Sequence, residues 1–191
     1  MSVQPWKRLE PTTETKGTYR SIITKTFQRK NGEVQGFDTF DREHIQHAGV
    51  IAVTREHKVV IARQFRPGPE MVMEEIPGGT LEANEDPLEA ASRECSEETG
   101  YKVGAIEYLG KVRKDAYMNA TWHYFLATDC ELTAVGQHLD DREEIEIVEI
   151  SIEKLFQNAY SGLMTDTDAV LLAYEKLKAL EGTWQESQKQ S

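Results

Sequence analysis

The sequence has few of the residues that mark secreted, zinc-binding or membrane proteins. Only two cysteines, Cys95 and Cys130, occur in 191 residues, far apart and without CxxC spacing, so neither a disulfide framework nor a zinc site is expected. The five histidines form no metal-ligand spacing. No apolar run reaches transmembrane length, and the first residues, MSVQPWKRLEP, lack the apolar segment of a signal peptide. We therefore expect a cytoplasmic protein.

Positive charge is scarce as well. The chain carries 22 basic and 33 acidic residues, which gives a net charge of −11. Binding to nucleic acid or to an anionic membrane needs a basic surface, so we expect neither as a partner. An anionic phosphate substrate has to be attracted by local cations, either a metal ion or arginines, against an unfavourable overall field.

The length and the 39% hydrophobic content allow one domain with a substantial core and a small additional subdomain. We expect residues 1–45 to form an N-terminal β-sheet subdomain and residues 46–182 to form the main domain. Residues 183–191, which follow Gly182, are polar and are expected to form a flexible tail.

Local patterns predict the individual elements. Residues 1–16 are interpreted as an extended lead-in, and Asn31-Gly32 predicts a β-hairpin turn. Helices are expected after Ser151 and from Thr167 or Asp168. Strands are predicted at residues 19–28, 34–40, 49–54, 58–65, 71–76, 105–112, 122–128 and 144–148. Strands before and after a central helix, with two helices at the end, predict an α+β fold with a mixed sheet.

The central helix is predicted within residues 79–101, GTLEANEDPLEAASRECSEETGY. Pro87 follows two acidic residues, as is typical of a helix N-terminus, and Gly100 suits the position just after a helix. Glu94 and Glu98 lie four residues apart and therefore share one face of this helix. Their mutual repulsion, at the negative end of the helix dipole, is relieved if a divalent cation binds there; the alternative is a solvated acidic face.

Seven positions in this stretch have a fixed spacing: one Gly, a Glu, Arg-Glu, Glu-Glu and a final Gly. They match the Nudix box, G-x5-E-x7-R-E-U-x-E-E-x-G-U, in which U is a bulky apolar residue. Cys95 and Tyr101 fill the two U positions. A chance match has a probability on the order of 10⁻⁷ per window. The chain therefore resembles the Nudix hydrolases, and the resemblance implies an α/β/α sandwich with a mixed sheet.

The resemblance also implies a metal site. In this family the backbone carbonyl at Gly78 and the carboxylates of Glu94 and Glu98 hold Mg²⁺ or Mn²⁺, with Glu97 as a shared ligand or orienting group. Arg93 is expected to fix these carboxylates by charge-assisted hydrogen bonds. The structural residues of the box are Gly79, Glu85 and Gly100.

The segments RQFRPG and EEIPGG resemble the ADP-ribose pyrophosphatase branch of the family. We expect Arg63 and Arg66 on one face of a strand, with at least one of them at a substrate phosphate. A surface cation that pairs with the acidic box is the alternative. Glu75 precedes the glycines, where the family often carries an acidic residue near the metals, and we group it with the substrate-binding residues.

One loop departs from this branch. ADP-ribose pyrophosphatases typically carry a Pro about sixteen residues beyond the last Gly of the box. Here that position is Ala116, followed by Tyr117. A Tyr near this spacing is a marker of dinucleoside-polyphosphate hydrolases, so Tyr117 either stacks on a base or caps the loop.

A second acidic loop precedes the last predicted strand. In the ADP-ribose branch, a loop here supplies a metal ligand or general base, and Glu143 takes that position with Asp141 as its acidic neighbour. In the wider family the base corresponds to Glu97. A solvated acidic loop remains the alternative.

The implied reaction is metal-dependent hydrolysis of a pyrophosphate bond, with ADP-ribose first and AMP and ribose 5-phosphate as products. Another nucleotide sugar or a dinucleoside polyphosphate is the first alternative, and a non-catalytic nucleotide-binding module is the second. The resemblance further implies a homodimer in which the N-terminal sheet contacts the nucleoside.

Overall fold

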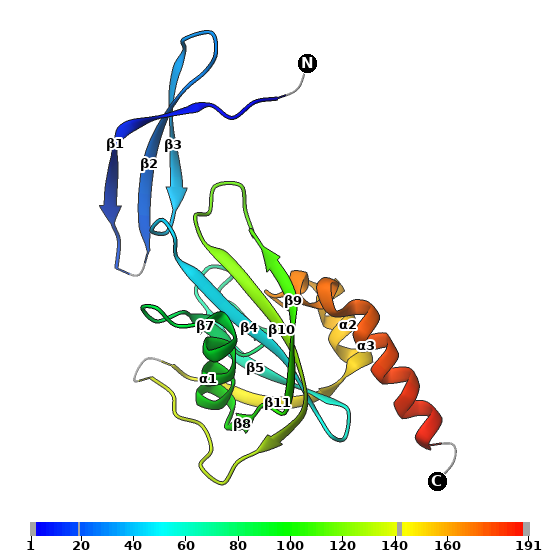
Figure 1. Cartoon of the computed structure of the whole chain (residues 1–191). Coiled ribbons are helices and arrows are strands. Elements are labelled where there is room, and N and C mark those ends of the chain that lie inside the picture. The colour runs from blue at the N-terminus through cyan, green and yellow to red at the C-terminus, as the bar shows by residue number, and fades with distance from the viewer. Residues whose placement is uncertain (1–2, 19, 141–142, 189–191) are drawn as a thin grey trace. The chain divides into compact units, whose positions relative to one another are not determined.

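The computed structural model describes residues 3–18, 20–140 and 143–188, and the chain divides into two compact units (Figure 1). Unit 1 consists of residues 1–46 and 113–121, and unit 2 consists of residues 47–112 and 122–191. The strands are β1 (Lys7–Lys16), β2 (Ser21–Gln28), β3 (Val34–Phe40), β4 (Gln46–Thr54), β5 (Lys58–Arg66), β6 (Met71–Glu75), β7 (Gly78–Thr80), β8 (Tyr101–Lys102), β9 (Ala105–Val112), β10 (Thr121–Leu132) and β11 (Glu146–Ser151), and the helices are α1 (Pro87–Thr99), α2 (Ile152–Ser161) and α3 (Thr167–Gln188).

Unit 1 is built on a three-stranded antiparallel sheet in the order β1-β2-β3. The hairpin predicted around Asn31-Gly32 is confirmed, and Gly32 has the positive φ of 87° that such a turn favours. The interpretation of residues 1–16 as an extended lead-in was wrong, because residues 7–16 form β1 and pair with β2. Strands pair through main-chain groups, so a polar strand such as β1 needs no alternation of apolar and polar residues that would reveal it in the sequence.

Residues 113–121 belong to unit 1 although they lie far from it in the sequence. The Phe40 amide donates to the Tyr117 carbonyl at 2.8 Å, and the Asn119 amide donates to the Phe40 carbonyl at 2.9 Å. The side chain of Asn119 also bonds to Lys25 of β2 and to Thr39 of β3. These contacts make the segment an extension of the small sheet.

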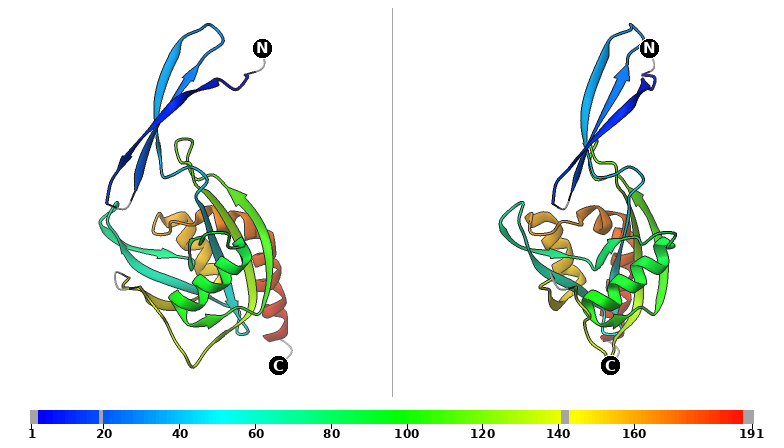
Figure 2. Two further views of the ribbon diagram at one scale, coloured as in Figure 1. Left: turned by 60° about the vertical axis from the view of Figure 1, so that its left-hand side comes forward. Right: turned by 90° about the vertical axis from the view of Figure 1, so that its left-hand side faces the viewer.

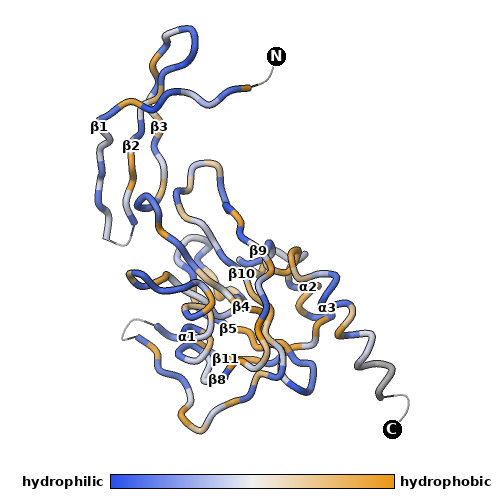
Figure 3. The backbone as a smooth tube through the Cα atoms, in the orientation of Figure 1, coloured by the Kyte–Doolittle hydropathy of each residue, from blue (hydrophilic) through white to orange (hydrophobic). Residues whose placement is uncertain are grey.

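Unit 2 contains an eight-stranded sheet with helices on both faces (Figure 2). Its central order is β11-β5-β4-β10-β8, while β6, β7 and β9 pair with β5, β4 and β10, respectively. Alternate residues of β4 pack on opposite layers: Val50 and Ala52 belong to the core under α1, and Ile51 and Val53 to the core under α2 and α3. A strand covered on both faces is apolar throughout, as the hydrophobic segments inside unit 2 show (Figure 3). This arrangement confirms the α/β/α sandwich.

The last helix, α3, extends beyond the expected boundary at Gly182 and ends at Gln188. Gly182 is exposed, and a Cβ at this position would meet nothing within 4 Å, so the glycine weakens the helix without ending it. Among the described residues, no helix is long and apolar enough to cross a membrane.

Candidate active site

The acidic residues of the predicted box lie on α1, whose ends are fixed by local signals. Asp86 is the N-cap, and its side chain accepts a hydrogen bond from the Leu88 amide at 2.9 Å. Pro87 occupies the first turn, and Gly100 ends the helix with a left-handed φ of 75°. The predicted helix and both of its boundaries are therefore confirmed.

Arg93 is the centre of an ion-pair network on this helix. Its Nε and Nη2 donate to the two oxygens of Glu85 at 2.8 and 3.0 Å. Its Nη1 donates to Glu94 at 3.0 Å and to Glu97 at 2.8 Å. The hydrogen bonds from Arg93 lower the pKa of Glu85, and the pKa of Arg93 itself is raised, first of all by Glu85. The guanidinium thus offsets part of the repulsion among the glutamates.

Two glycines allow the backbone to approach these carboxylates. A Cβ on Gly79 would lie 2.3 Å from Oε1 of Glu94, and a Cβ on Gly78 would lie 2.4 Å from the Ala48 carbonyl oxygen. The Gly78 amide donates to Oε2 of Glu98 at 2.8 Å. Any larger residue here would displace either β4 or the carboxylate, which explains why β7 carries glycine at both positions.

The carboxylate of Glu98 is the most perturbed of this group. The residue is 6% exposed, and burial raises its pKa to about 8, with further contributions from the charges of Glu94, Glu143 and Glu75. The pKa of Glu94 is also raised, again chiefly by burial. The two carboxylates with raised pKa values, Glu94 and Glu98, share one face of α1 and form a site that is poised to take up a positive charge.

This charge pattern fits a divalent cation. Among residues 3–18, 20–140 and 143–188, no three or more acidic, His or Cys side chains are already arranged as a metal cage. Arg93 Nη1 bonds to one oxygen of Glu94 and to one oxygen of Glu97. The donor set nevertheless consists of oxygen atoms only, which suits Mg²⁺ or Mn²⁺. A buried Glu98 with a pKa near 8 is the group that a bound cation would stabilise in its charged form.

The loop between β10 and β11 is tied to the C-terminus of α1. Gln137 Nε2 donates to the Glu98 carbonyl at 2.6 Å, and the His138 amide donates to the Glu97 carbonyl at 2.7 Å. These bonds satisfy helix carbonyls that have no partner within the helix. The sequence reasoning missed Gln137 and His138, because nothing local marks a loop residue as a partner of a distant helix end.

Glu143 lies in the same loop and is exposed. Its Oε2 accepts a hydrogen bond from the Asp140 amide at 3.1 Å, and its charge contributes to the raised pKa values of both Glu94 and Glu98. The structure therefore brings Glu143 near the box residues. Asp141, its expected acidic neighbour, falls outside the described residues.

Arg63 and Arg66 do not share a face of β5, so that expectation was wrong. Arg63 donates from Nε and Nη2 to Glu74 at 3.1 and 2.9 Å, whereas Arg66 pairs with Glu75. Glu74 and Glu75 are neighbours on β6 and point to opposite sides. Residues three apart on a strand lie on opposite faces, so the sequence itself already contained this result.

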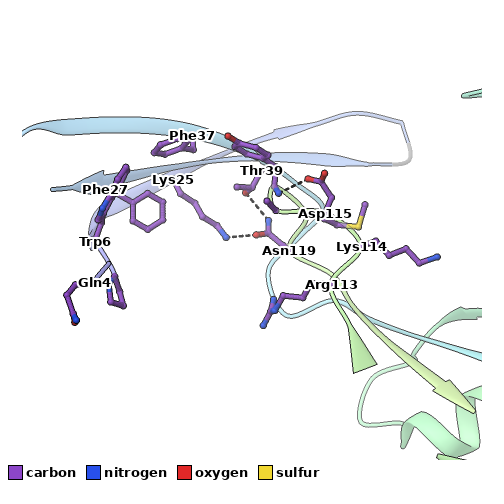
Figure 4. Close-up of a pocket in the computed structure, with 14 residues that line it drawn as sticks. Gln4, Trp6, Lys25, Phe27, Phe37, Thr39, Arg113, Lys114, Asp115 and Asn119 are labelled. Carbon is purple, nitrogen blue, oxygen red and sulfur yellow. Dashed lines mark hydrogen bonds between the residues drawn. The ribbon is translucent and has the colours of Figure 1, made fainter. Parts of the chain in front are cut away.

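Tyr117 lies in unit 1, where it lines a cavity of about 910 Å³ (Figure 4). Aromatic side chains border the cavity: the rings of Trp6 and Tyr117 lie 6.0 and 6.4 Å from that of Phe37. Lys25 and Asn119, which are hydrogen-bonded to each other, also line it. Apolar ring faces beside a few polar groups are the usual composition of a small-molecule pocket.

Comparison with known proteins now defines the class of this protein. Residues 43–184 match the family model described as the NUDIX domain, so the chain belongs to the Nudix family. It is a Nudix pyrophosphohydrolase, which confirms the resemblance drawn from the box.

Relatives and a solved structure agree with this assignment. The chain is 32% identical to the ADP-ribose pyrophosphatase of Bacillus subtilis, over 72% of this chain and 77% of that protein. It is 30% identical to the methanol dehydrogenase activator of Bacillus methanolicus, covering 85% and 89%, and 31% identical to the GDP-mannose pyrophosphatase of Cronobacter sakazakii, covering 78% and 83%. A crystal structure of an ADP compounds hydrolase has the same fold, with a TM-score of 0.76 at 18% identity over 94% of this chain and 98% of that one.

Proposed function

We propose that this protein hydrolyses the pyrophosphate bond of a nucleoside diphosphate sugar, with ADP-ribose as its first substrate and with Mg²⁺ or Mn²⁺ as cofactor. The buried Glu98, which accepts a hydrogen bond from the Gly78 amide and has a pKa near 8, is the observation that carries the proposal. The relative named ADP-ribose pyrophosphatase supports the choice of substrate.

Each residue of the site has a chemical task in this proposal. Glu94 and Glu98, with the Gly78 carbonyl, would hold the cation, and Glu97 would share or orient it. When bound, the cation lowers the pKa of a coordinated water and neutralises the diphosphate. Arg93 keeps Glu94 and Glu97 in place through its Nη1 bonds.

Glu143 is our first candidate for the general base, and Glu97 is the second. Glu143 is exposed, so its carboxylate is available to accept a proton from water. Its charge also acts on Glu98. The water oxygen then bonds to one phosphorus, the P–O–P bond breaks, and AMP and ribose 5-phosphate leave. Arg66 would bind a phosphate oxygen of the substrate.

The experiment is a phosphatase-coupled assay over ADP-ribose, ADP-glucose, GDP-mannose and diadenosine polyphosphates with either metal. Preferential hydrolysis of ADP-ribose, lost in Glu143→Gln and retained in the exposed neighbour Glu144→Gln, supports the proposal. If hydrolysis of ADP-ribose is lost in Glu97→Gln and retained in Glu143→Gln, Glu97 is the general base. Binding without turnover would indicate a regulatory module, a role that fits the relative named as a dehydrogenase activator.

GDP-mannose is the second candidate substrate, because several relatives of 30–31% identity are named GDP-mannose pyrophosphatases. The assay separates it directly from ADP-ribose. Turnover of diadenosine polyphosphates alone would instead favour the reading of Tyr117 as the marker of that activity.

We also propose that unit 1 binds a nucleoside base in its aromatic cavity and mediates a homodimer. Trp6, Phe37 and Tyr117 offer ring faces, and base–aromatic stacking of this kind is sequence-tolerant. Calorimetric titration with AMP should show weaker binding for Tyr117→Ala than for the wild type. Light scattering that gives the mass of one chain, about 21.7 kDa, would reject the dimer.

A further inference from the structure

The hairpin of β5 and β6 carries two Arg–Glu pairs whose surroundings differ. Arg63 pairs with Glu74 on one face of the hairpin, and Arg66 pairs with Glu75 on the other. Both pairs use Nε and Nη2 of the guanidinium, but Arg63 directs both groups to one oxygen of Glu74, whereas Arg66 bonds to both oxygens of Glu75. The hairpin therefore provides its own internal control for what each pair does.

The Arg63–Glu74 pair is part of the packing between the sheet and the helices. The second oxygen of Glu74 contacts Asn158 of α2, which is 2% exposed. The main chain of Glu74 also accepts from the Thr165 amide and donates to the Leu163 carbonyl. This pair joins the hairpin to the segment between α2 and α3.

Among residues 3–18, 20–140 and 143–188, the structure shows no such bond between the Arg66–Glu75 pair and a helix. Glu75 is 6% exposed, and its two oxygens accept hydrogen bonds from Arg66 Nε at 2.6 Å, from Arg66 Nη2 and from Gln64 at 3.3 Å. The Arg66 side chain is 44% exposed, and its Nη1 is not needed for the pair. The charges of Glu98 and Asp166 act on the same guanidinium. Arg66 is therefore fixed through Nε and Nη2 by a buried carboxylate, while Nη1 is not used by this pair.

We propose that Glu75 is a positioning residue that fixes the plane of the Arg66 guanidinium, so that Nη1 is presented to a phosphate oxygen of the substrate. This inference rests on the proposed function. Without Glu75, Arg66 would sample many rotamers and would have to lose that freedom each time a substrate binds. A two-point bond removes this loss in advance. Both oxygens of Glu75 accept hydrogen bonds from Arg66, so the guanidinium is held at two points.

The test is a double-mutant cycle of Glu75→Gln and Arg66→Ala, with Glu74→Gln as the matched control. For ADP-ribose, Glu75→Gln should raise KM about 5- to 20-fold, leave kcat within about twofold and leave the Mg²⁺ concentration for half-maximal activity unchanged. In the Arg66→Ala background, Glu75→Gln should have no further effect on KM. Glu74→Gln should lower Tm and leave KM within about twofold.

Two results would overturn the proposal. One is a fall in kcat or a shifted Mg²⁺ requirement when Glu75→Gln is added to Arg66→Ala, which would make Glu75 part of the metal site. The other is an unchanged KM in a folded Glu75→Gln. If that variant does not fold, Glu75→Asp, whose shorter side chain breaks the two-point geometry, takes its place with the same expectation.

A binding measurement separates this inference from the proposed function. Calorimetry with the non-hydrolysable α,β-methylene-ADP follows the same cycle without turnover. If the wild type hydrolyses nothing in the panel, the proposed activity fails. The positioning role would still be supported if Glu75→Gln weakens binding of the analogue in the presence of Arg66 and has no effect on binding in the Arg66→Ala background. Equal binding by the wild type and Glu75→Gln would reject it.

Discussion

Two carboxylates, one in each unit, have nearly opposite environments. Glu43 in unit 1 accepts hydrogen bonds from the Arg8 guanidinium at 2.7 and 3.1 Å and from the Lys25 ammonium at 2.9 Å. These hydrogen bonds lower the pKa of Glu43 to about 2. Glu98 in unit 2 is buried beside other glutamates, and its pKa is raised to about 8. The first carboxylate is most stable when charged, and the second is most stable when neutral.

The difference distinguishes a structural acid from a functional one. A carboxylate with two cationic partners contributes stability at neutral pH. A buried carboxylate among like charges reduces stability, and proteins retain such residues where activity needs them. The spacing of the box singles out Glu98 in the sequence, but only the folded neighbours of the two glutamates show that the pKa of Glu98 is raised and that of Glu43 is lowered.

The largest expected effect is on catalysis. Glu98→Gln should lower kcat on the order of 10³-fold, because a neutral amide is a poor ligand for a divalent cation. The same change should raise the Tm of the metal-free protein at pH 8, because it removes a buried charge. Coupled assays and thermal melts measure the two effects. Glu89→Gln, on the exposed side of the same helix, is the control that should change neither. If Glu98→Gln kept its activity, Glu98 would not be a functional carboxylate and would not differ from Glu43 in that respect.

Metal binding should produce the next largest effect. At a concentration of 100 times Kd, a ligand stabilises the folded state by about 2.7 kcal/mol, which corresponds to about 5–10 °C in Tm for a chain of this size. Mg²⁺ should give a shift of this size in the wild type and little shift in Glu98→Gln. Differential scanning fluorimetry with and without EDTA measures it. An equal shift in both proteins would place the cation elsewhere.

In the absence of metal, the raised pKa of Glu98 should be visible in the pH dependence of stability. Unfolded, Glu98 titrates near its ordinary pKa of 4.5, and folded it titrates near 8, so between these values the folded state holds the extra proton. Stability therefore falls as the pH rises from 5 to 8. In EDTA, the fall in Tm over this range should be greater for the wild type than for Glu98→Gln by about 3 °C or more. Parallel curves would contradict the raised pKa.

Much of the site near α1 could be predicted because its signals are local. Asp86, Pro87 and Gly100 bound the helix, and the spacing of Glu94 and Glu98 places them on one face. Arg63 and Arg66 of β5 are three residues apart, so the two-residue period of a strand predicts opposite faces for them, as the structure shows.

Non-local contacts account for what the sequence did not reveal. Strand β1 exists because β2 lies beside it, and residues 113–121 join unit 1 through bonds to Phe40. Likewise, Gln137 reaches the end of α1 from a loop almost forty residues away in the sequence. Such pairings depend on which segments meet in space, and a single sequence contains no periodicity that reports it.

The smallest expected effect concerns Glu43. Glu43→Gln should lower the stability of unit 1 by about 1 kcal/mol at pH 7, because Arg8 and Lys25 keep hydrogen-bond acceptors but lose a partner charge. Since the pKa of Glu43 is lowered to about 2, its contribution is present above its ordinary pKa of 4.5 and disappears as the pH falls toward 2. Circular dichroism melts should therefore separate the wild type from Glu43→Gln at pH 7 and bring them together near pH 2. Glu33→Gln, which changes an exposed acid in the turn between β2 and β3, should have a smaller effect at pH 7. If Glu43→Gln instead stabilised the protein as Glu98→Gln does, the two carboxylates would belong to the same class, and the raised pKa of Glu98 would no longer identify it as the functional one.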